Sequence, residues 1–576
     1  MDNMRGPAAP KDPTARRPYF YILQNKDIFG APQPDGKFVH FLYMDFGRLP
    51  DAARLTGNVT DQKMLDDIAT IEGLKRIVGA FGVSISSGQS AKKVKFIAEM
   101  YPTNPGEKAT VIEKDITMDG METVIELGEV TWSEHDRELG QIRFEFDEEG
   151  LQATADVRFY LNDGYEAPEQ AEEKAVDLES EAYRAMISKS LMHAGNSYRM
   201  GRVLAKAEKG EDVTVALIGG SITQGAGAVP INENCYARLF YEDFVKRYMK
   251  GGECTFIKAG VGGTPSELGM IRFDRDVLRD GNEKPDLIVI EFAVNDEGDE
   301  TRGVCYESLV RKALTLPWKP AVILLFSVFS NDWNLQDRLG PVGIRYDIPM
   351  VSVLDAVSPQ FPLLPSEGRV ISKNQFFYDV YHPSNLGHRI MADCLLNLVE
   401  HIRDSEKSPM DIYDVEGTEP AIGTGFEKVE LLDRKEYDRL SGAYDISTLS
   451  EGSFGGIDED LQCVEIDKEI RQTPEFPHNW HHAFGNEDNT PFTMKLSCSK
   501  ALLVFKDSAN ANVGVAEVFV DGKKVLDADP HINNWTHCNP VIILDEKTTA
   551  EHSVEIKMRE DCLGKEFTIL GFGIVR

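Results

Sequence analysis

Ser221 stands where a serine nucleophile would be expected in an α/β sheet. It follows the apolar run Val213 to Ile218 and is preceded by Gly219 and Gly220. Glycines beside the serine let the backbone turn sharply and let a substrate approach the main chain, which leaves the serine N–H free to bind a developing negative charge. Taken alone, the serine could equally be a helix N-cap. Its chemistry therefore depends on partners elsewhere in the chain.

Asp379 and His382 provide these partners. They lie three residues apart, just before the predicted start of a helix near Pro383 or Ser384. A histidine can take the serine proton during attack and return it to the leaving alcohol, and a carboxylate on its other nitrogen fixes the tautomer. The pair makes Ser221 a candidate nucleophile rather than only a helix cap.

Two further segments offer donors for an oxyanion. The glycine-rich segment 258–264 follows one apolar strand, and Asn295 ends another, Leu287 to Phe292. Glycines present an unobstructed backbone N–H, and the Asn295 amide adds a side-chain donor. Alone, Asn295-Asp296 would be an ordinary turn at the end of a strand.

Strands alternating with helices must position these groups. The pattern between about Met186 and Asp404 predicts βαβ units, hence a parallel sheet covered on both faces, which binds ligands at its carboxyl edge. The predicted strands are Val213 to Ile218, Leu287 to Phe292 and Val322 to Val328, and the predicted helices are Met200 to Lys209, Tyr236 to Met249 and Gly387 to Ile402.

The flanking regions predict β-structure. Short alternating runs from about Phe20 to Tyr165 indicate strands joined by turns, and Asp521-Gly522 marks a hairpin within a second β-region. We therefore expect three domains: an N-terminal β-rich domain with an acidic linker (1–185), an α/β domain (186–408) and a jelly-roll-like C-terminal sandwich that could bind carbohydrate (409–576).

These motifs together resemble conserved blocks of the SGNH (GDSL-like) hydrolases: Gly-Gly-Ser221-Ile-Thr, Gly263 in its glycine cluster, Asn295-Asp296, and Asp379-x-x-His382. The resemblance implies a flavodoxin-like three-layer fold and ester hydrolysis through an acyl-enzyme. It also implies that Ser221 is the nucleophile and an N–H donor, Gly263 and Asn295 are the other oxyanion donors, His382 is the base and Asp379 orients it. Gly260 and Gly262 remain alternatives to Gly263.

Two positions depart from the common family pattern. Gly220 stands where many members carry Asp, and Ala293 stands where a Gly usually precedes x-Asn-Asp. Neither position supplies a catalytic side chain. A Gly-Gly-Ser-Ile-Thr motif with an attached β-domain is similar to bacterial carbohydrate acetyl esterases, so the resemblance implies O-acetyl groups on oligosaccharides as the substrate.

Other functions on the same residues stay open. The same triad could hydrolyse lipid or thioester acyl chains, or transfer the acyl group to another alcohol instead of water. A non-catalytic carbohydrate-binding protein with a decayed hydrolase domain is a third interpretation. The complete set of candidate residues favours an enzyme.

Three tryptophans are candidates for sugar binding, because exposed indole rings stack on sugar rings: Trp333, Trp480 and Trp535. Trp480 and Trp535 could instead be buried core residues, and the segment that carries Trp333 could instead cap a helix. Three histidines, His478, His481 and His482, match no standard zinc spacing, so we expect no metal and no organic cofactor.

The acidic composition bears on partners. With 95 acidic and 62 basic side chains, the formal charge of −33 argues against nucleic acid or an anionic membrane surface as a partner. The first 17 residues lack the apolar core of a secretory signal, and the eight cysteines form no CxxC pair. These features predict a soluble cytoplasmic protein with reduced thiols; they leave the oligomeric state undetermined.

Overall fold

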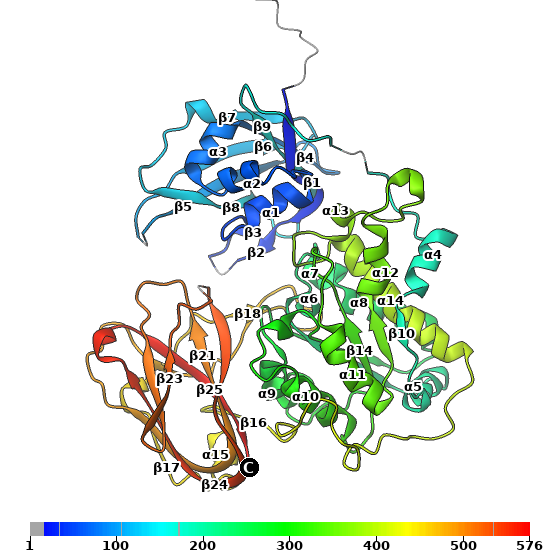
Figure 1. Ribbon diagram of the computed structural model, residues 1–576, viewed down its shortest axis with the longest axis vertical. Coiled ribbons are helices and arrows are strands. Elements are labelled where there is room, and N and C mark those ends of the chain that lie inside the picture. Colours follow the sequence, from blue (N-terminus) through cyan, green and yellow to red (C-terminus); the bar gives the residue numbers. More distant parts are fainter. Residues whose placement is uncertain (1–16, 34, 105, 171–172, 534) are drawn as a thin grey trace, which may run out of the picture. The chain divides into compact units, whose positions relative to one another are not determined.

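The computed structural model describes residues 17–576 apart from 34, 105, 171, 172 and 534. The chain divides into two compact units, with the division between Lys174 and Ala175 (Figure 1). The stretch in which we expect no secretory signal lies almost entirely outside the described residues. The predicted boundary at 185/186 falls within helix α4, Glu181–Ser188, which packs against helix α14 of the second unit.

Two antiparallel sheets build the first unit. One sheet has the order β1-β9-β4-β7 and the other the order β2-β3-β8-β5-β6. Their strands are β1 Tyr19–Phe29, β2 Ala31–Pro32, β3 Phe38–Tyr43, β4 Val78–Ser86, β5 Lys93–Pro102, β6 Val111–Thr117, β7 Thr123–Glu126, β8 Asp136–Phe146 and β9 Gln152–Leu161. The β-rich character predicted from the sequence is confirmed.

Three short helices in this unit were not predicted: α1 Arg48–Leu55, α2 Gln62–Ile68 and α3 Ile71–Ile77. Local capping signals were present, since Asp61 accepts hydrogen bonds from two backbone N–H groups at the start of α2 and Thr70 accepts one at the start of α3. Helices of seven or eight residues are too short for a clear apolar period, which explains why they were missed.

A six-stranded sheet forms the centre of the second unit. Five strands run parallel in the order β12-β11-β13-β14-β15, and β10 joins the edge antiparallel to β15. This is the flavodoxin-like strand order, as expected, with the switch point beside β11. The strands are β10 Leu191–His193, β11 Val213–Gly219, β12 Cys254–Gly260, β13 Leu287–Glu291, β14 Ala321–Phe326 and β15 Met350–Ser352.

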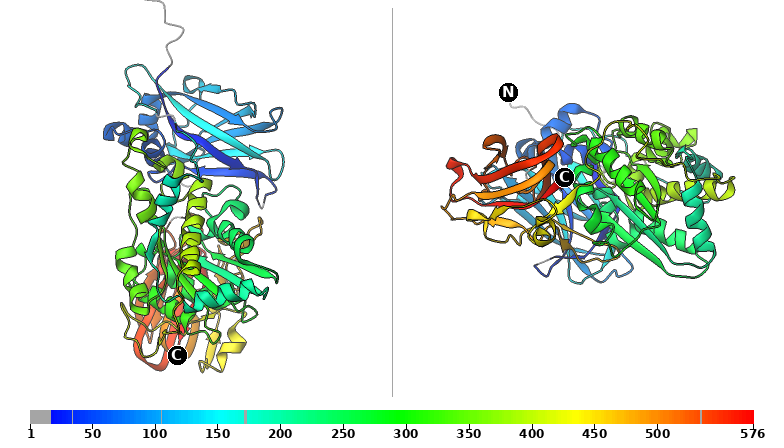
Figure 2. Two further views of the ribbon diagram at one scale, coloured as in Figure 1. Left: turned by 90° about the vertical axis from the view of Figure 1, so that its right-hand side faces the viewer. Right: turned by 90° about the horizontal axis from the view of Figure 1, so that it is seen from below.

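Helices cover both faces of this sheet (Figures 1 and 2). Helices α5, α8 and α14 pack against one another, and α10 packs against both α9 and α11. The longer helices are α5 Tyr198–Glu208, α8 Tyr236–Tyr248, α9 Ser266–Asp276, α10 Val304–Leu314, α11 Gln336–Tyr346 and α14 Asn385–Asp404, and the shorter ones are α6 Ser221–Gln224, α7 Ile231–Asn234, α12 Val353–Val357 and α13 Lys373–Phe376. The predicted three-layer arrangement is confirmed. Within the described residues, no helix has the length and apolarity to cross a membrane.

The rest of the second unit is β-rich, and its described residues include one short α-helix, α15 Tyr437–Ser441. Its main sheet has the order β16-β25-β21-β24-β22-β23. The strands are β16 Glu430–Leu432, β17 Thr448–Ser450, β18 Cys463–Val464, β19 Thr473–Pro474, β20 Trp480–His482, β21 Phe492–Asp507, β22 Ala516–Val520, β23 Lys523–Ala528, β24 His537–Met558 and β25 Phe567–Val575. The predicted hairpin joins β22 to β23, with positive φ at both Asp521 and Gly522.

The α/β and β-rich parts of the second unit share one hydrophobic core. Ile218 and Ile290 of the central sheet belong to the same buried cluster as Leu502 and Leu570 of the β-rich part. Residues of the β-rich part can therefore be held firmly next to the loops at the edge of the central sheet. All eight cysteines are free.

Candidate active site

The turn that carries Ser221 has no room for side chains on the two preceding residues. Strand β11 ends at Gly219, and Ser221 is the first residue of α6. A Cβ on Gly219 would lie 2.1 Å from Thr223 Oγ1, and a Cβ on Gly220 would lie 2.1 Å from Asn295 Oδ1. In this chain the Asn295 amide packs against Gly220, the position that departs from the common family pattern.

Ser221, His382 and Asp379 form one hydrogen-bonded chain. His382 Nε2 lies 3.0 Å from Ser221 Oγ, and His382 Nδ1 lies 2.8 Å from Asp379 Oδ2. The loop between α13 and α14 holds both partners, and the other Asp379 oxygen accepts the N–H groups of Tyr381 and His382, each at 2.8 Å. The three residues predicted from the sequence therefore meet, although 158 positions separate Ser221 from Asp379 in the chain.

The charge of Asp379 sets the state of the histidine. Burial raises the pKa of the Asp379 carboxyl, but the His382 ring and the two backbone N–H groups lower it by more, so the pKa lies below its usual value. An ionised carboxylate only accepts hydrogen bonds, so His382 carries its proton on Nδ1 and presents the Nε2 lone pair to Ser221. This arrangement can deprotonate the serine hydroxyl.

The three glycines at the end of β12 and in the loop that follows it differ in what their N–H groups bind. Gly260 lies within β12 and pairs with Gly219, and the Gly262 N–H donates to Gln224 Oε1 at 3.0 Å. The N–H groups of Gly263 and Ser221 make no hydrogen bond within the described part of the chain. Of the three glycines considered, Gly263 is the one whose N–H can serve an oxyanion.

Asn295 lies at the start of a 3-10 turn directly after β13. Its Oδ1 is buried without a hydrogen-bond partner among the described residues, and its amide packs against Gly220, one residue before the serine. The Asn295 amide therefore lies next to the residue that precedes Ser221, and its NH2 group is the part that could donate to an oxyanion.

A buried carboxyl beneath the turn was missed by the sequence analysis. Glu291, at the end of β13, accepts hydrogen bonds from Thr223 Oγ1 on α6 and from Ser327 Oγ after β14. Burial raises the pKa of Glu291 to about 7, against the lowering effect of these two hydroxyl groups. Glu291 thus ties the nucleophile helix to the neighbouring strand; nothing in the pattern of an apolar strand indicated this contact.

Aromatic side chains lie close to the histidine. Trp333 stacks on Phe329 with ring centroids 6.2 Å apart, Phe329 contacts Tyr381 edge-on at 5.4 Å, and Tyr381 lies 6.2 Å from the His382 ring. Trp333 is half-buried and Tyr381 is exposed. These rings form a continuous series of contacts from Trp333 to the His382 ring.

The other two predicted tryptophans differ in how exposed they are. Trp535 is 43% exposed, and its ring lies against Gly263, where a Cβ would come 2.6 Å from it. Trp480 is 1% exposed, packs between Phe492 and Phe572 and donates its N–H to Glu451. The suggestion that Trp480 binds sugar is therefore wrong, because no ligand can reach a ring in the core.

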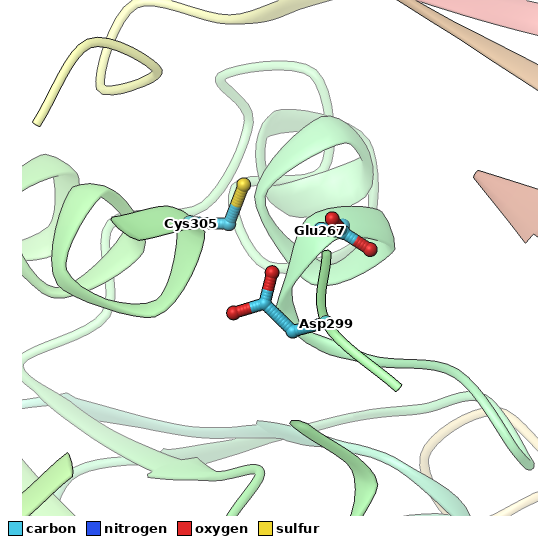
Figure 3. A group of neighbouring side chains, drawn as sticks. All are labelled: Glu267, Asp299 and Cys305. Carbon is cyan, nitrogen blue, oxygen red and sulfur yellow. The ribbon is translucent and has the colours of Figure 1, made fainter. Parts of the chain in front are cut away.

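One group of side chains in the described residues has a spacing that could hold a metal ion (Figure 3). It consists of Glu267, Asp299 and Cys305. Their ligand atoms lie within 4.8 Å of one another and all three residues are buried. The Asp299 oxygens, however, already accept three hydrogen bonds, from the N–H and hydroxyl of Thr301 and the N–H of Gly303. Burial and the nearby Asp299 carboxylate raise the pKa of Glu267 to about 10, which favours the protonated form of Glu267. The three hydrogen bonds that Asp299 already accepts argue against this group as a metal site.

Comparison with known families agrees with this geometry. Residues 217–390 match the model of the GDSL-like lipase/acylhydrolase family. The chain thus contains a GDSL-like, or SGNH, hydrolase domain. It is a carboxylic-ester hydrolase.

Two solved structures are similar over much of the chain. Both are titled as a two-domain esterase active on acetylated mannans, one of them co-crystallised with mannopentaose. Each is 26% identical and covers 68% of this chain, and the matches span 99% and 98% of those chains, with TM-scores of 0.53 and 0.55. A search among curated proteins found no match.

Proposed function

We propose that this protein is a serine esterase that removes O-acetyl groups from oligosaccharides. The observation that carries the proposal is the hydrogen-bonded chain from Ser221 through His382 to Asp379, at the carboxyl edge of the central sheet. Ser221 is the proposed nucleophile, His382 the base and Asp379 the residue that orients it. Ser221 N–H, Gly263 N–H and the Asn295 amide are the proposed oxyanion donors.

The reaction follows from these positions. Ser221 Oγ attacks the ester carbonyl carbon while His382 Nε2 takes its proton, and the carbonyl oxygen becomes an oxyanion bound by the three donors. Collapse breaks the bond to the sugar oxygen, which receives the proton from His382. Water then attacks the acetyl-serine with His382 again as base, and acetate leaves. The protein's side chains supply every proton transfer in this scheme.

The substrate class is supported by two observations. The similar two-domain structures are described as active on acetylated mannans. Two partly exposed indole rings could contact a sugar that carries the ester: Trp535 lies against Gly263, and Trp333 is linked to the His382 ring through Phe329 and Tyr381. Acetylated manno-oligosaccharides are therefore the first substrates to test.

Mass spectrometry of acetylated oligosaccharides incubated with the protein tests the proposal. We expect losses of single acetyl masses, abolished by Ser221→Ala and kept by the matched exposed variant Ser188→Ala. Normal turnover by Ser221→Ala would refute the mechanism. Cleavage of a chromogenic acetate with no acetyl loss from any sugar would refute the carbohydrate substrate alone.

The same preparation separates the rival functions. A steep rate gain from acetyl to octanoyl esters would point to lipid or thioester acyl chains. Labelling of Ser221 by a fluorophosphonate would dismiss a non-catalytic binding protein. Acetylated products formed with added sugar alcohols would indicate transfer rather than hydrolysis.

A further inference from the structure

The β-rich part of the second unit holds the loop that contains Gly263. The Gln462 side chain donates from Nε2 to the Gly262 carbonyl oxygen at 2.8 Å, and its Oε1 accepts the Cys538 N–H at 2.9 Å. Gln462 is 8% exposed. Because its oxygen faces a donor and its nitrogen faces an acceptor, the amide has one orientation that satisfies both contacts.

The bond to Gly262 acts on Gly263 through a shared peptide group. The Gly262 C=O and the Gly263 N–H belong to one planar, trans peptide unit, in which they point in opposite directions. A hydrogen bond that fixes the Gly262 carbonyl therefore also fixes the direction of the Gly263 N–H, the proposed oxyanion donor. A hydrogen bond to the carbonyl also polarises the peptide, which strengthens its N–H as a donor.

The next peptide is fixed from the same side. His537 Nε2 lies 3.1 Å from the Gly263 carbonyl oxygen, and His537 Nδ1 lies 3.0 Å from the fully buried Asp507. Gly263 has a φ of 69°, a conformation that favours glycine, and the Trp535 ring occupies the space a Cβ would need. The β-rich part thus contacts the peptide groups on both sides of Gly263.

We infer that Gln462 is a positioning residue for catalysis, which holds the Gly262–Gly263 peptide so that the Gly263 N–H faces the oxyanion. His537 supports the same loop from the following carbonyl. The inference rests on the proposed function, since it needs an oxyanion on Ser221. It makes the β-rich part a component of the catalytic apparatus rather than only a substrate-binding attachment.

Two variants test this role. Gln462→Glu keeps the size of the side chain and an oxygen for the Cys538 N–H, but an ionised carboxylate cannot donate to the Gly262 carbonyl. Gln462→Met removes both hydrogen bonds without adding charge. Gln360→Glu is the matched control, because Gln360 is 7% exposed and also accepts a backbone N–H, from Val370.

The assay uses p-nitrophenyl acetate, which has no sugar to bind elsewhere on the surface. Loss of a whole oxyanion donor costs about 100 to 1000-fold in kcat, so misaiming one should cost about 10 to 100-fold. We expect that fall in kcat for both Gln462 variants, with KM changed less than about threefold and thermal unfolding of Gln462→Met near that of the wild type.

A boronic acid that forms a tetrahedral adduct with Ser221 supplies the second readout. Its Ki should rise by the same factor by which kcat/KM falls, because the adduct places an oxygen among the same donors. Wild-type kcat in both Gln462 variants, or a lowered kcat with an unchanged Ki, would overturn the inference. Turnover that survives Ser221→Ala would instead overturn the proposed function itself.

Discussion

Replacing Asp379 by Asn tests how the structure sets the histidine tautomer. The two Asp379 oxygens accept three N–H groups, one from the His382 ring and two from the backbone. An asparagine has one oxygen and one NH2 group. In one orientation its NH2 group faces the His382 Nδ1–H, and in the other it faces the backbone N–H groups of the loop. Two hydrogen-bond donors then face each other in either case.

We expect the Asp379→Asn substitution to lower kcat. With the NH2 group facing Nδ1, His382 must carry its proton on Nε2, and it can then no longer accept the proton of Ser221. Loss of the correct tautomer in a serine triad lowers kcat by about 10⁴, or about 5.5 kcal/mol in the barrier. The alternative orientation keeps the tautomer but breaks the loop contacts, so we expect a fall of about 10³ to 10⁴.

The chain provides a matched control in a second Asp–His pair. Asp347 lies 2.7 Å from His193, and its side chain is 42% exposed against 44% for Asp379. Asp347→Asn should keep wild-type turnover of p-nitrophenyl acetate. The reasoning is refuted if Asp379→Asn, with an unchanged thermal unfolding midpoint, keeps more than about a tenth of the wild-type kcat.

Three further predictions address the oxyanion, the buried acid pair and the sugar contact. Asn295→Ala should lower kcat for p-nitrophenyl acetate by about 100 to 1000-fold with little change in KM, and kcat within threefold of the wild type would contradict its role as a donor. Folding raises the pKa of Glu267 from 4.5 to about 10, so the stability that Glu267 contributes falls as pH rises between these values, by at most about 1.4 kcal/mol per pH unit. Glu267→Gln cannot ionise and can still donate to Asp299, so thermal melts should match the wild type at pH 5 and show a higher midpoint at pH 9; equal midpoints at both pH values would argue against a protonated Glu267. Trp535→Ala should raise KM for acetylated manno-oligosaccharides about tenfold, the equivalent of ~1.4 kcal/mol of stacking, and leave KM for p-nitrophenyl acetate unchanged. Equal losses on both substrates would show that the ring supports the neighbouring loop rather than the sugar.

The sequence was sufficient for features that depend on local pattern. The strand before Ser221, its two glycines and the three-residue spacing of Asp379 and His382 are short-range signals, and the structure brings these residues together. The alternation of strands and helices likewise predicted the parallel sheet, because each element must bury one apolar face or stripe. The local pattern did not give the length of the strands in the β-rich part, where β24 alone spans His537–Met558.

Tertiary structure alone decided what faces these residues. Trp480 and Trp535 look alike in sequence, yet one is buried in the core and the other lies partly exposed against Gly263. Glu291 and Gln462 carry no motif, and their contacts to α6 and to the Gly262 carbonyl arise from elements far away in the chain. Burial and hydrogen-bond partners depend on which surfaces the fold places in contact, and that information is not local. The sequence determined which groups can do chemistry, and the packing of the β-rich part against the central sheet determined how the oxyanion loop is held.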